Sequence, residues 1–240
     1  MSALFFVYSS QLPDGETVLA LLQRAASDPA HRLEFSKQFE AFNGSCLVHL
    51  LAEHCRLEEL RWMCSNVTEV RFAEQVDYDG CSPLHHCCSS IAQRHSQGVG
   101  AAAIVEMVKY MAEDMGVNVN LQDLSGGTAA HCAAESALTG GDALLILQAL
   151  KALGADLSLV TKSHGLDVAM TVAQMHGPGP WLTWCLSEGG CDGSRRCADG
   201  LSAEDYAAEY LEESGGSSDE SEGSGSEFTS DSESEGMADD

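Results

Sequence analysis

The sequence predicts an all-α protein built from stacked helical repeats. Apolar residues make up 44% of the chain and aromatic residues 6%, and Leu- and Ala-rich runs favour helices packed through small aliphatic side chains over a β-sandwich. A short pattern also recurs: a glycine, a polar or small residue two positions later, then an apolar pair or triplet that leads into a helix. The polar or small residues of this pattern are at positions 46, 82, 128, 167 and 202, so successive copies lie 36, 46, 39 and 35 residues apart. Self-similarity of this kind is typical of repeat architectures.

Two copies carry the pattern most clearly. Residues 79–88 read Asp-Gly-Cys-Ser-Pro-Leu-His-His-Cys-Cys, and residues 120–134 read Asn-Leu-Gln-Asp-Leu-Ser-Gly-Gly-Thr-Ala-Ala-His-Cys-Ala-Ala. Both resemble the ankyrin repeat, with Ser in place of Thr in the Thr-Pro-Leu-His tetrapeptide of the first copy. The resemblance implies an ankyrin-repeat α-solenoid of about five repeats, with short β-hairpin or turn fingers. It also implies structural roles for Gly80, Ser82, Pro83, Leu84, His85, Gly126, Thr128 and His131.

Residues 1–42 are predicted to form N-terminal capping helices, because a solenoid needs terminal units that shield its core. One apolar face is expected on a first helix from Val18, Leu21, Leu22 and Ala25. Asp28, followed by a proline, is a candidate N-cap for a second helix. Its three phenylalanines are expected to share one side of that helix: Phe35, Phe39 and Phe42.

The repeat domain is predicted to span residues 43–211. Segments near 89–101 and 136–142 are rich in small residues and are interpreted as lengthened loops between the two helices of a repeat. Apolar spacing predicts the buried faces of two second helices: Ile104, Val105, Val108 and Met111 on one, and Leu144, Leu145, Gln148, Ala149 and Ala152, more weakly, on the other.

The run His85-His86-Cys87-Cys88, close to Cys81, could suggest a zinc site. Adjacent residues on a helix point about 100° apart, however, so they do not converge on one ion. Instead we expect His85 to hydrogen-bond locally, as the ankyrin resemblance implies, and the cysteines to pack between helices. No metal, cofactor or catalytic residue is expected, since the chain lacks phosphate-loop, nucleophile-elbow, metalloprotease and dinucleotide motifs.

Two further groups of residues have alternative interpretations. Cys185, Cys191 and Cys197 are expected to be buried thiols, and Cys197 is a candidate reactive thiol because two arginines precede it. Trp181 and Trp184 could anchor a partner, but the interpretation as core residues of a second helix is preferred.

The net charge of −25 is not confined to the C-terminus. Residues 212–240 contain 11 acidic residues and no basic one, which leaves 26 acidic against 12 basic residues, a charge of −14, in residues 1–211. Such a charge disfavours nucleic acid and anionic membranes and favours a basic protein partner. Residues 1–10 have the wrong length and flanks for a secretion or membrane segment, and ten cysteines suit a reducing compartment. The protein is therefore expected in the cytosol or nucleus. It is also expected to be a monomer.

Residues 212–240 are predicted to be a disordered acidic tail, because a Gly, Ser, Glu and Asp composition cannot bury enough apolar surface to fold. Four serines have an acidic residue three positions later and resemble acidophilic kinase sites: Ser217, Ser224, Ser230 and Ser232. The alternative is a tail that only improves solubility.

The predicted function is a non-catalytic binding scaffold for a basic protein, either as an escort or assembly chaperone or as a signalling or ubiquitin-ligase adaptor; an enzyme is the outside alternative. The resemblance implies that partners meet the finger tips and the first helices. The expected tip residues are Asp77, Tyr78, Asp79, Gln122, Asp123, Leu124, Lys162 and Asp192, and the expected first-helix residues are Glu53, His54, Glu135 and Gln174.

Overall fold

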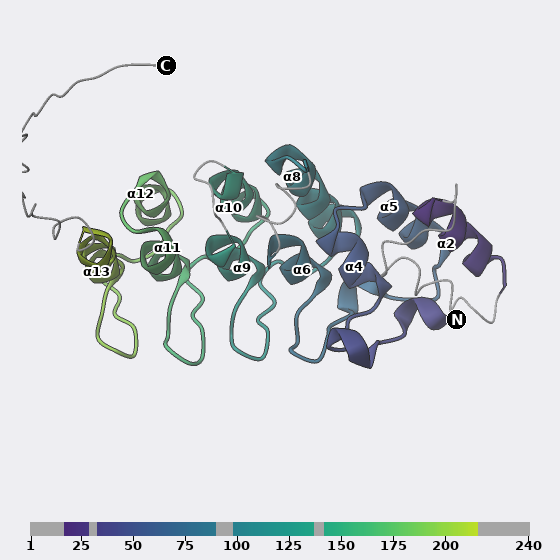
Figure 1. Cartoon of the computed structure of the whole chain (residues 1–240), viewed down its shortest axis with the longest axis horizontal. Helices are drawn as coiled ribbons and strands as arrows, with labels where there is room; N and C mark the ends of the chain where they lie inside the picture. Colours follow the sequence, from purple (N-terminus) through teal and green to yellow (C-terminus); the bar gives the residue numbers. More distant parts are fainter. Residues whose placement is uncertain (1–16, 29–32, 90–97, 137–141, 216–240) are drawn as a thin grey trace, which may run out of the picture.

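The computed structural model describes residues 17–28, 33–89, 98–136 and 142–215, and its helices lie in two rows with loops projecting from one side (Figure 1). The row nearer the loops holds the first helix of each repeat: α4 (Leu47–Glu53), α6 (Pro83–Ser89), α9 (Ala129–Glu135), α11 (Val168–His176) and α13 (Ala203–Gly215). The other row holds the second helices: α5 (Leu57–Asn66), α8 (Ala101–Lys109), α10 (Asp142–Ala152) and α12 (Pro180–Ser187). The predicted all-α solenoid is confirmed.

The five recurring polar or small positions each stand directly before a first helix. Cys46, Thr128 and Asp167 are the N-cap residues of α4, α9 and α11. Ser82 and Ser202 immediately precede α6 and α13. Because the first turn of a helix leaves backbone N–H groups without partners, a capping side chain at this point fixes where the helix begins. The sequence pattern therefore marks the start of each first helix.

The loops before the first helices form the fingers, at residues 39–45, 77–81, 123–127, 161–166 and 197–201. A backbone hydrogen bond closes each finger, as between the Asp123 N–H and the Gly127 carbonyl at 2.8 Å. Gly126 has a φ of +85°, and a Cβ there would lie 2.8 Å from the backbone nitrogen of Lys162 in the next finger. Glycine is thus needed both for the turn and for the close stacking of fingers. In the described residues the fingers are turns, apart from an isolated bridge between Phe39 and Ser45.

Neighbouring finger tips are joined by one backbone hydrogen bond each. In each bond the N–H donor lies in one finger, and the carbonyl acceptor lies in the finger before it. The pairs are Tyr78 to Asn43, Leu124 to Asp79, Lys162 to Ser125 and Ala198 to His164, at 2.7 to 2.9 Å. The fingers therefore form a continuous edge along the solenoid.

The N-terminal cap differs in part from its prediction. Helix α2 (Val18–Ala26) buries the expected apolar face. The predicted second helix is instead two short 3₁₀ segments, η1 (Leu33–Ser36) and η2 (Glu40–Phe42), so its phenylalanines do not share a buried side. Phe35 is buried, whereas Phe42 is 39% exposed. The chain leaves the helical conformation after Ser36. The Phe39 N–H binds the Ser45 carbonyl, and the chain turns back at Asn43, which has a φ of 52°.

The second helices also correct one predicted face. Helix α8 continues into a π-helical turn, η4 (Tyr110–Asp114), and buries most of the face expected from its spacing. Helix α10 turns a partly different face to the core: Ala149 is buried as predicted, but Leu145 is half exposed. The other buried residues of α10 were not predicted: Ala143, Ile146, Leu147 and Leu150. Residues 143–147 are all apolar, so the spacing there did not distinguish one face from another.

At the C-terminal end, Trp181 and Trp184 of α12 are buried, which confirms their interpretation as core residues. Helix α13 runs to Gly215, past the predicted boundary at Leu211. In the described part of the chain, no helix combines the length and the apolar content needed to cross a membrane. Residues 1–16, most of the two expected long loops, and the tail from residue 216 with its four candidate serines, Ser217, Ser224, Ser230 and Ser232, lie outside the described residues.

Candidate partner-binding site

Buried histidines connect three first helices to the following fingers. In the third repeat, Nδ1 of His131 accepts the Thr128 N–H at 3.2 Å, and Nε2 lies 3.1 Å from the Leu166 carbonyl oxygen in the next finger. A backbone N–H only donates and a carbonyl only accepts, so this ring is neutral and carries its proton on Nε2. Burial lowers the pKa of His131 and keeps it in that form. The same pair of bonds recurs at His49 and His85.

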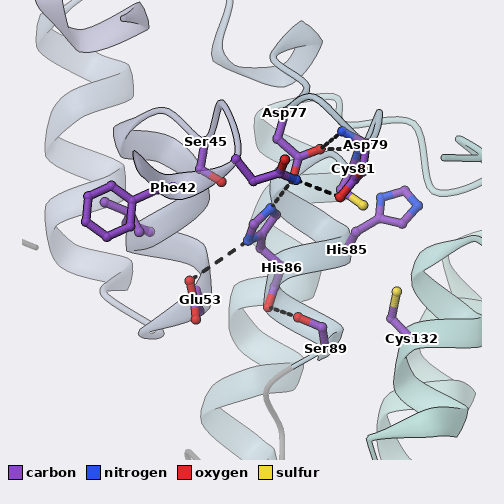
Figure 2. Close-up of a pocket in the computed structure, with 12 residues that line it drawn as sticks. Phe42, Ser45, Glu53, Asp77, Asp79, Cys81, His85, His86, Ser89 and Cys132 are labelled. Carbon is purple, nitrogen blue, oxygen red and sulfur yellow. Dashed lines mark hydrogen bonds and ion pairs between the residues drawn. The ribbon is translucent and has the colours of Figure 1, made fainter. Parts of the chain in front are cut away.

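A cavity of about 330 Å³ lies in the corner between the fingers and the first helices (Figure 2). The fingers contribute Phe42, Asp77 and Asp79 to its lining, and helices α4 and α6 contribute Glu53 and His86. We call this space the finger–helix cavity. Since it combines residues from the first three repeats, it exists only when those repeats are stacked.

His86 bridges two carboxylates inside the finger–helix cavity. Its Nε2 lies 2.9 Å from Oδ2 of Asp77, and its Nδ1 lies 3.9 Å from Oε2 of Glu53 (Figure 2). Burial disfavours the His86 cation, but the contacts with Glu53 and Asp77 outweigh that effect, and the pKa of His86 is raised. The ring also meets His49 edge to face, with centroids 4.9 Å apart. The structure thus places a proton-binding group between two acids.

The finger–helix cavity is strongly acidic. Asp77 is buried and holds its own finger together, because Oδ1 accepts the N–H groups of Asp79 and Cys81. Asp79 is exposed and accepts a hydrogen bond from Asn43 at 2.6 Å. Burial and the nearby carboxylates raise the pKa of the Cys81 thiol to about 12. No Lys or Arg is among the described residues that line the cavity.

Apolar side chains are exposed along the finger edge beside the cavity. Tyr78 is 50% exposed and Leu124 is 66% exposed. A Cβ on Gly44 would lie 2.4 Å from the Tyr78 ring, and the Leu124 backbone nitrogen would lie 3.3 Å from a Cβ on Gly80, so each tip packs on the glycine of the preceding finger. Two further exposed residues belong to this region, and we define the apolar edge as Phe42, Val76, Tyr78 and Leu124.

A sequence model of the ankyrin repeat family matches residues 79–124. This segment begins in the second finger, contains α6, α8 and η4, and ends at the tip of the third finger. Residues 79–124 therefore contain an ankyrin repeat. No curated protein sequence matches the chain. Ankyrin repeats generally mediate protein–protein interactions and are typically non-catalytic.

The ankyrin fold brings together only some of the residues predicted to bind a partner. Glu53, Asp77 and Asp79 line the finger–helix cavity. Tyr78 and Leu124 lie on the apolar edge beside it. The other predicted positions are distributed over the remaining surface: His54 caps α4, Asp123 and Lys162 lie in the third and fourth fingers, Glu135 and Gln174 are exposed on α9 and α11, and Gln122 donates to the Gly126 and Val160 carbonyls.

Asp192 is not a tip residue, contrary to its prediction. It lies before the fifth finger and accepts hydrogen bonds from the N–H and the hydroxyl of Ser194. Asp156 makes the same two contacts with Ser158 ahead of the fourth finger. Both aspartates therefore shape the turn that leads into a finger, and the tip of the fifth finger is formed by Ala198 and its neighbours.

Sequence reasoning missed two residues of the cavity, His86 and Phe42. His86 follows the histidine of the ankyrin tetrapeptide, and it was considered only as a metal ligand or a structural residue. Phe42 was assigned to a buried helical face. Neither residue stands next to a predicted acidic tip in the sequence, so no local signal marked it as part of the site. Their convergence depends on the stacking of α4 beside α6, which no local pattern describes.

The three C-terminal cysteines are buried, as predicted. The pKa of Cys197 is lowered: burial opposes this, but hydrogen bonds from the Tyr206 hydroxyl, at 3.4 Å, and from backbone N–H groups outweigh it. The preceding arginines are not the cause, contrary to the prediction. Arg195 donates to the Ser158 carbonyl, and Arg196 donates to the Gly200 carbonyl and to Asp205.

Proposed function

We propose that this protein binds a basic segment of a protein partner at the finger–helix cavity. The observation that carries the proposal is the composition of the cavity, whose described lining includes the three acidic residues Glu53, Asp77 and Asp79. A concave site lined by one sign of charge concentrates ligands of the opposite sign. The adjacent apolar edge adds surface that a partner can remove from water.

The charge of the whole chain supports an escort or assembly-chaperone role. Residues 1–211 carry −14 and residues 212–240 add 11 acidic side chains, so the protein can screen a basic partner well beyond one contact site. An adaptor that captures an apolar peptide is the alternative, and the exposure of Tyr78 and Leu124 favours it. Salt separates the two: binding of a basic partner weakens steeply as ionic strength rises, whereas apolar binding does not. We also propose the cytosol or nucleus as the compartment, since ten cysteines suit a reducing environment.

Charge reversal tests the proposed site. Affinity capture with the full chain identifies partners, and titration then measures their affinity for the double variant Glu53→Lys, Asp79→Lys. We expect affinity to fall at least about tenfold, because two attractive contacts become repulsive. Asp77 is left intact because it closes its own finger. The matched control is Glu113→Lys, Glu209→Lys, which makes the same charge change at exposed positions away from the cavity.

An equal loss in both double variants would show that only the total charge matters, and the site assignment would then be wrong. Unchanged binding in the Glu53→Lys, Asp79→Lys variant would remove the proposed site altogether. Capture with and without residues 212–240 measures the part played by the tail, and partners lost on truncation are those that need it.

A further inference from the structure

His86 already occupies the place where a cation is expected in the finger–helix cavity. Its ring is held between Asp77 and Glu53, at 2.9 and 3.9 Å, and its side chain is 19% exposed. A protonated imidazole is a planar cation that donates from both ends. The free protein therefore contains an internal group that can neutralise the two carboxylates when it binds a proton.

The groups that surround His86 come from four elements. Helix α4 contributes Glu53 and His49, and α6 contributes the neighbouring His85. The second finger and α9 supply the remaining titratable groups of the lining: Asp77, Asp79, Cys81 and Cys132. Burial, then the His86 charge, lower the pKa of His49 to about 4, and burial lowers that of His85, whereas the pKa of His86 is raised. Among the described lining residues, His86 is thus the imidazole whose protonated form its neighbours favour.

The open side of the cavity fits a planar cation from outside. Glu53 retains 30% side-chain exposure and Asp79 is exposed, so both carboxylates can be reached by a partner. Phe42 lines the same space and is 39% exposed, which leaves part of its ring accessible. A guanidinium group pairs with carboxylates through several N–H donors and also stacks on aromatic rings, whereas an ammonium group is a strongly hydrated point charge.

We propose that the finger–helix cavity receives one arginine side chain of the partner segment, and that this arginine displaces the proton that His86 holds between Glu53 and Asp77. This inference rests on the proposed function and names the group that is recognised. Residues next to that arginine then lie on the apolar edge, beginning with Tyr78. The favoured segment is one arginine flanked by apolar side chains.

The proposal fixes the direction of the pH dependence. A bound guanidinium adds positive charge beside His86 and so favours the neutral imidazole, and the complex holds fewer protons than the free protein. By linkage, affinity rises with pH through the pKa of His86 and falls as the solution becomes more acidic. The carboxylate partners raise the pKa of His86 above its ordinary value of 6.5, so this change in affinity occurs at a higher pH than an ordinary histidine would give.

Blocked nine-residue peptides test the inference on the full chain. One contains a single central arginine between two leucines with glycine and serine elsewhere, and matched peptides carry lysine or citrulline, the neutral isostere, at the centre. NMR titration of the isotope-labelled protein locates binding and measures affinity. We expect the arginine peptide to perturb the signals of Phe42, Asp79 and His86. We also expect it to bind about tenfold more tightly at about pH 8 than at about pH 6, the scale of a single linked proton.

The variant His86→Gln keeps a donor towards Asp77 but cannot titrate in this range. We expect it to bind the arginine peptide with less than about a twofold change between the two pH values. His54→Gln, an exposed histidine at the end of α4, is the control and should retain the full pH dependence.

Equal binding of the citrulline peptide, perturbations away from the cavity, or an unchanged pH dependence in His86→Gln would each overturn the proposal. Equal binding of the lysine peptide would overturn the assignment to arginine. These failures are separable from failure of the proposed function. If Glu53→Lys, Asp79→Lys still weakens capture of basic partners, the binding scaffold stands and only the arginine receptor is lost.

Discussion

The third and fourth repeats begin their first helices with different chemistry. In the third repeat, Thr128 and His131 close the first turn, and the His131 ring also reaches the Leu166 carbonyl of the next finger. In the fourth repeat, Oδ1 of Asp167 caps the helix through the Met170 N–H, while its buried Oδ2 has no hydrogen-bond partner among the described residues. Met170 occupies the position in the fourth repeat that corresponds to His131, and its side chain has no ring that could reach the following finger. The capping contacts therefore extend to the next repeat in the third repeat, whereas they stay within one helix in the fourth.

This difference shows where neighbouring repeats are coupled by a buried histidine and where they are joined without one. In each of the first three repeats, a histidine side chain hydrogen-bonds to a backbone carbonyl in the next finger. The fourth and fifth are joined by the packing of α11 against α13 and by the Ala198 N–H, which binds the His164 carbonyl. In a solenoid the interface between neighbours carries much of the stability. We therefore expect the C-terminal end to open first and the acidic cavity to lie in the more strongly coupled part.

Removing a shared histidine should have the largest effect. His131→Ala leaves the buried Thr128 N–H without its partner, removes one of the two donors to the Leu166 carbonyl and opens a void, so we expect the free energy of unfolding to fall by about 3 kcal/mol. Urea titration followed by circular dichroism measures this change. His164→Ala, an exposed histidine in the fourth finger, is the control and should cost less than about 0.5 kcal/mol. If the two variants were equally stable, the hydrogen bonds of His131 would not be a source of stability.

Acid should weaken the first repeats more than the last ones. The pKa of buried His49 is about 4, below its ordinary value of 6.5, so the unfolded chain takes up a proton before the folded one does. The stability it contributes is complete above pH 6.5 and is lost as the pH falls towards about 4, by about 3 kcal/mol in total. The raised pKa of His86 works in the opposite direction and offsets part of the loss.

Hydrogen exchange at about pH 7 and about pH 5, corrected for the intrinsic rates, locates this effect along the chain. We expect protection to fall in α4, α6 and α9. In α11 burial raises the pKa of Asp167, so acid relieves rather than adds a cost there. A uniform loss along the chain would contradict the comparison between the two regions.

The sequence predicted the starts of the first helices better than it predicted the contacts between repeats, for a physical reason. A cap and the histidine three residues later lie within one helical turn, so residues such as Thr128 and His131 can be recognised locally. The register of α10 could not be recognised, because Leu144 and Leu145 are as apolar as the residues that are buried. The acidic tips Asp77 and Asp79 were predicted as binding residues because the ankyrin resemblance places partners at the finger tips.

The bridge from Asp77 through His86 to Glu53 could not be predicted in this way. It joins residues 9 and 33 positions apart, and it forms only because α6 stacks beside α4. Its geometry depends on the distance between two helices, which the period of the sequence does not specify. The same holds for His131, whose partner Leu166 belongs to the next repeat.

A histidine placed in the fourth repeat should reduce the difference between the two regions. In Met170→His, Nδ1 can accept the Asp167 N–H and Nε2 can donate to the Leu201 carbonyl, which precedes α13 as the Leu166 carbonyl precedes α11. We expect a gain of about 1 kcal/mol or less, the usual worth of one added hydrogen bond after loss of methionine packing. Met170→Leu keeps the apolar volume and adds no bond, so it is the matched control. Slower hydrogen exchange in α13 of Met170→His than of Met170→Leu would show that the last two repeats are now coupled, whereas equal exchange would mean that packing already determines how they are joined.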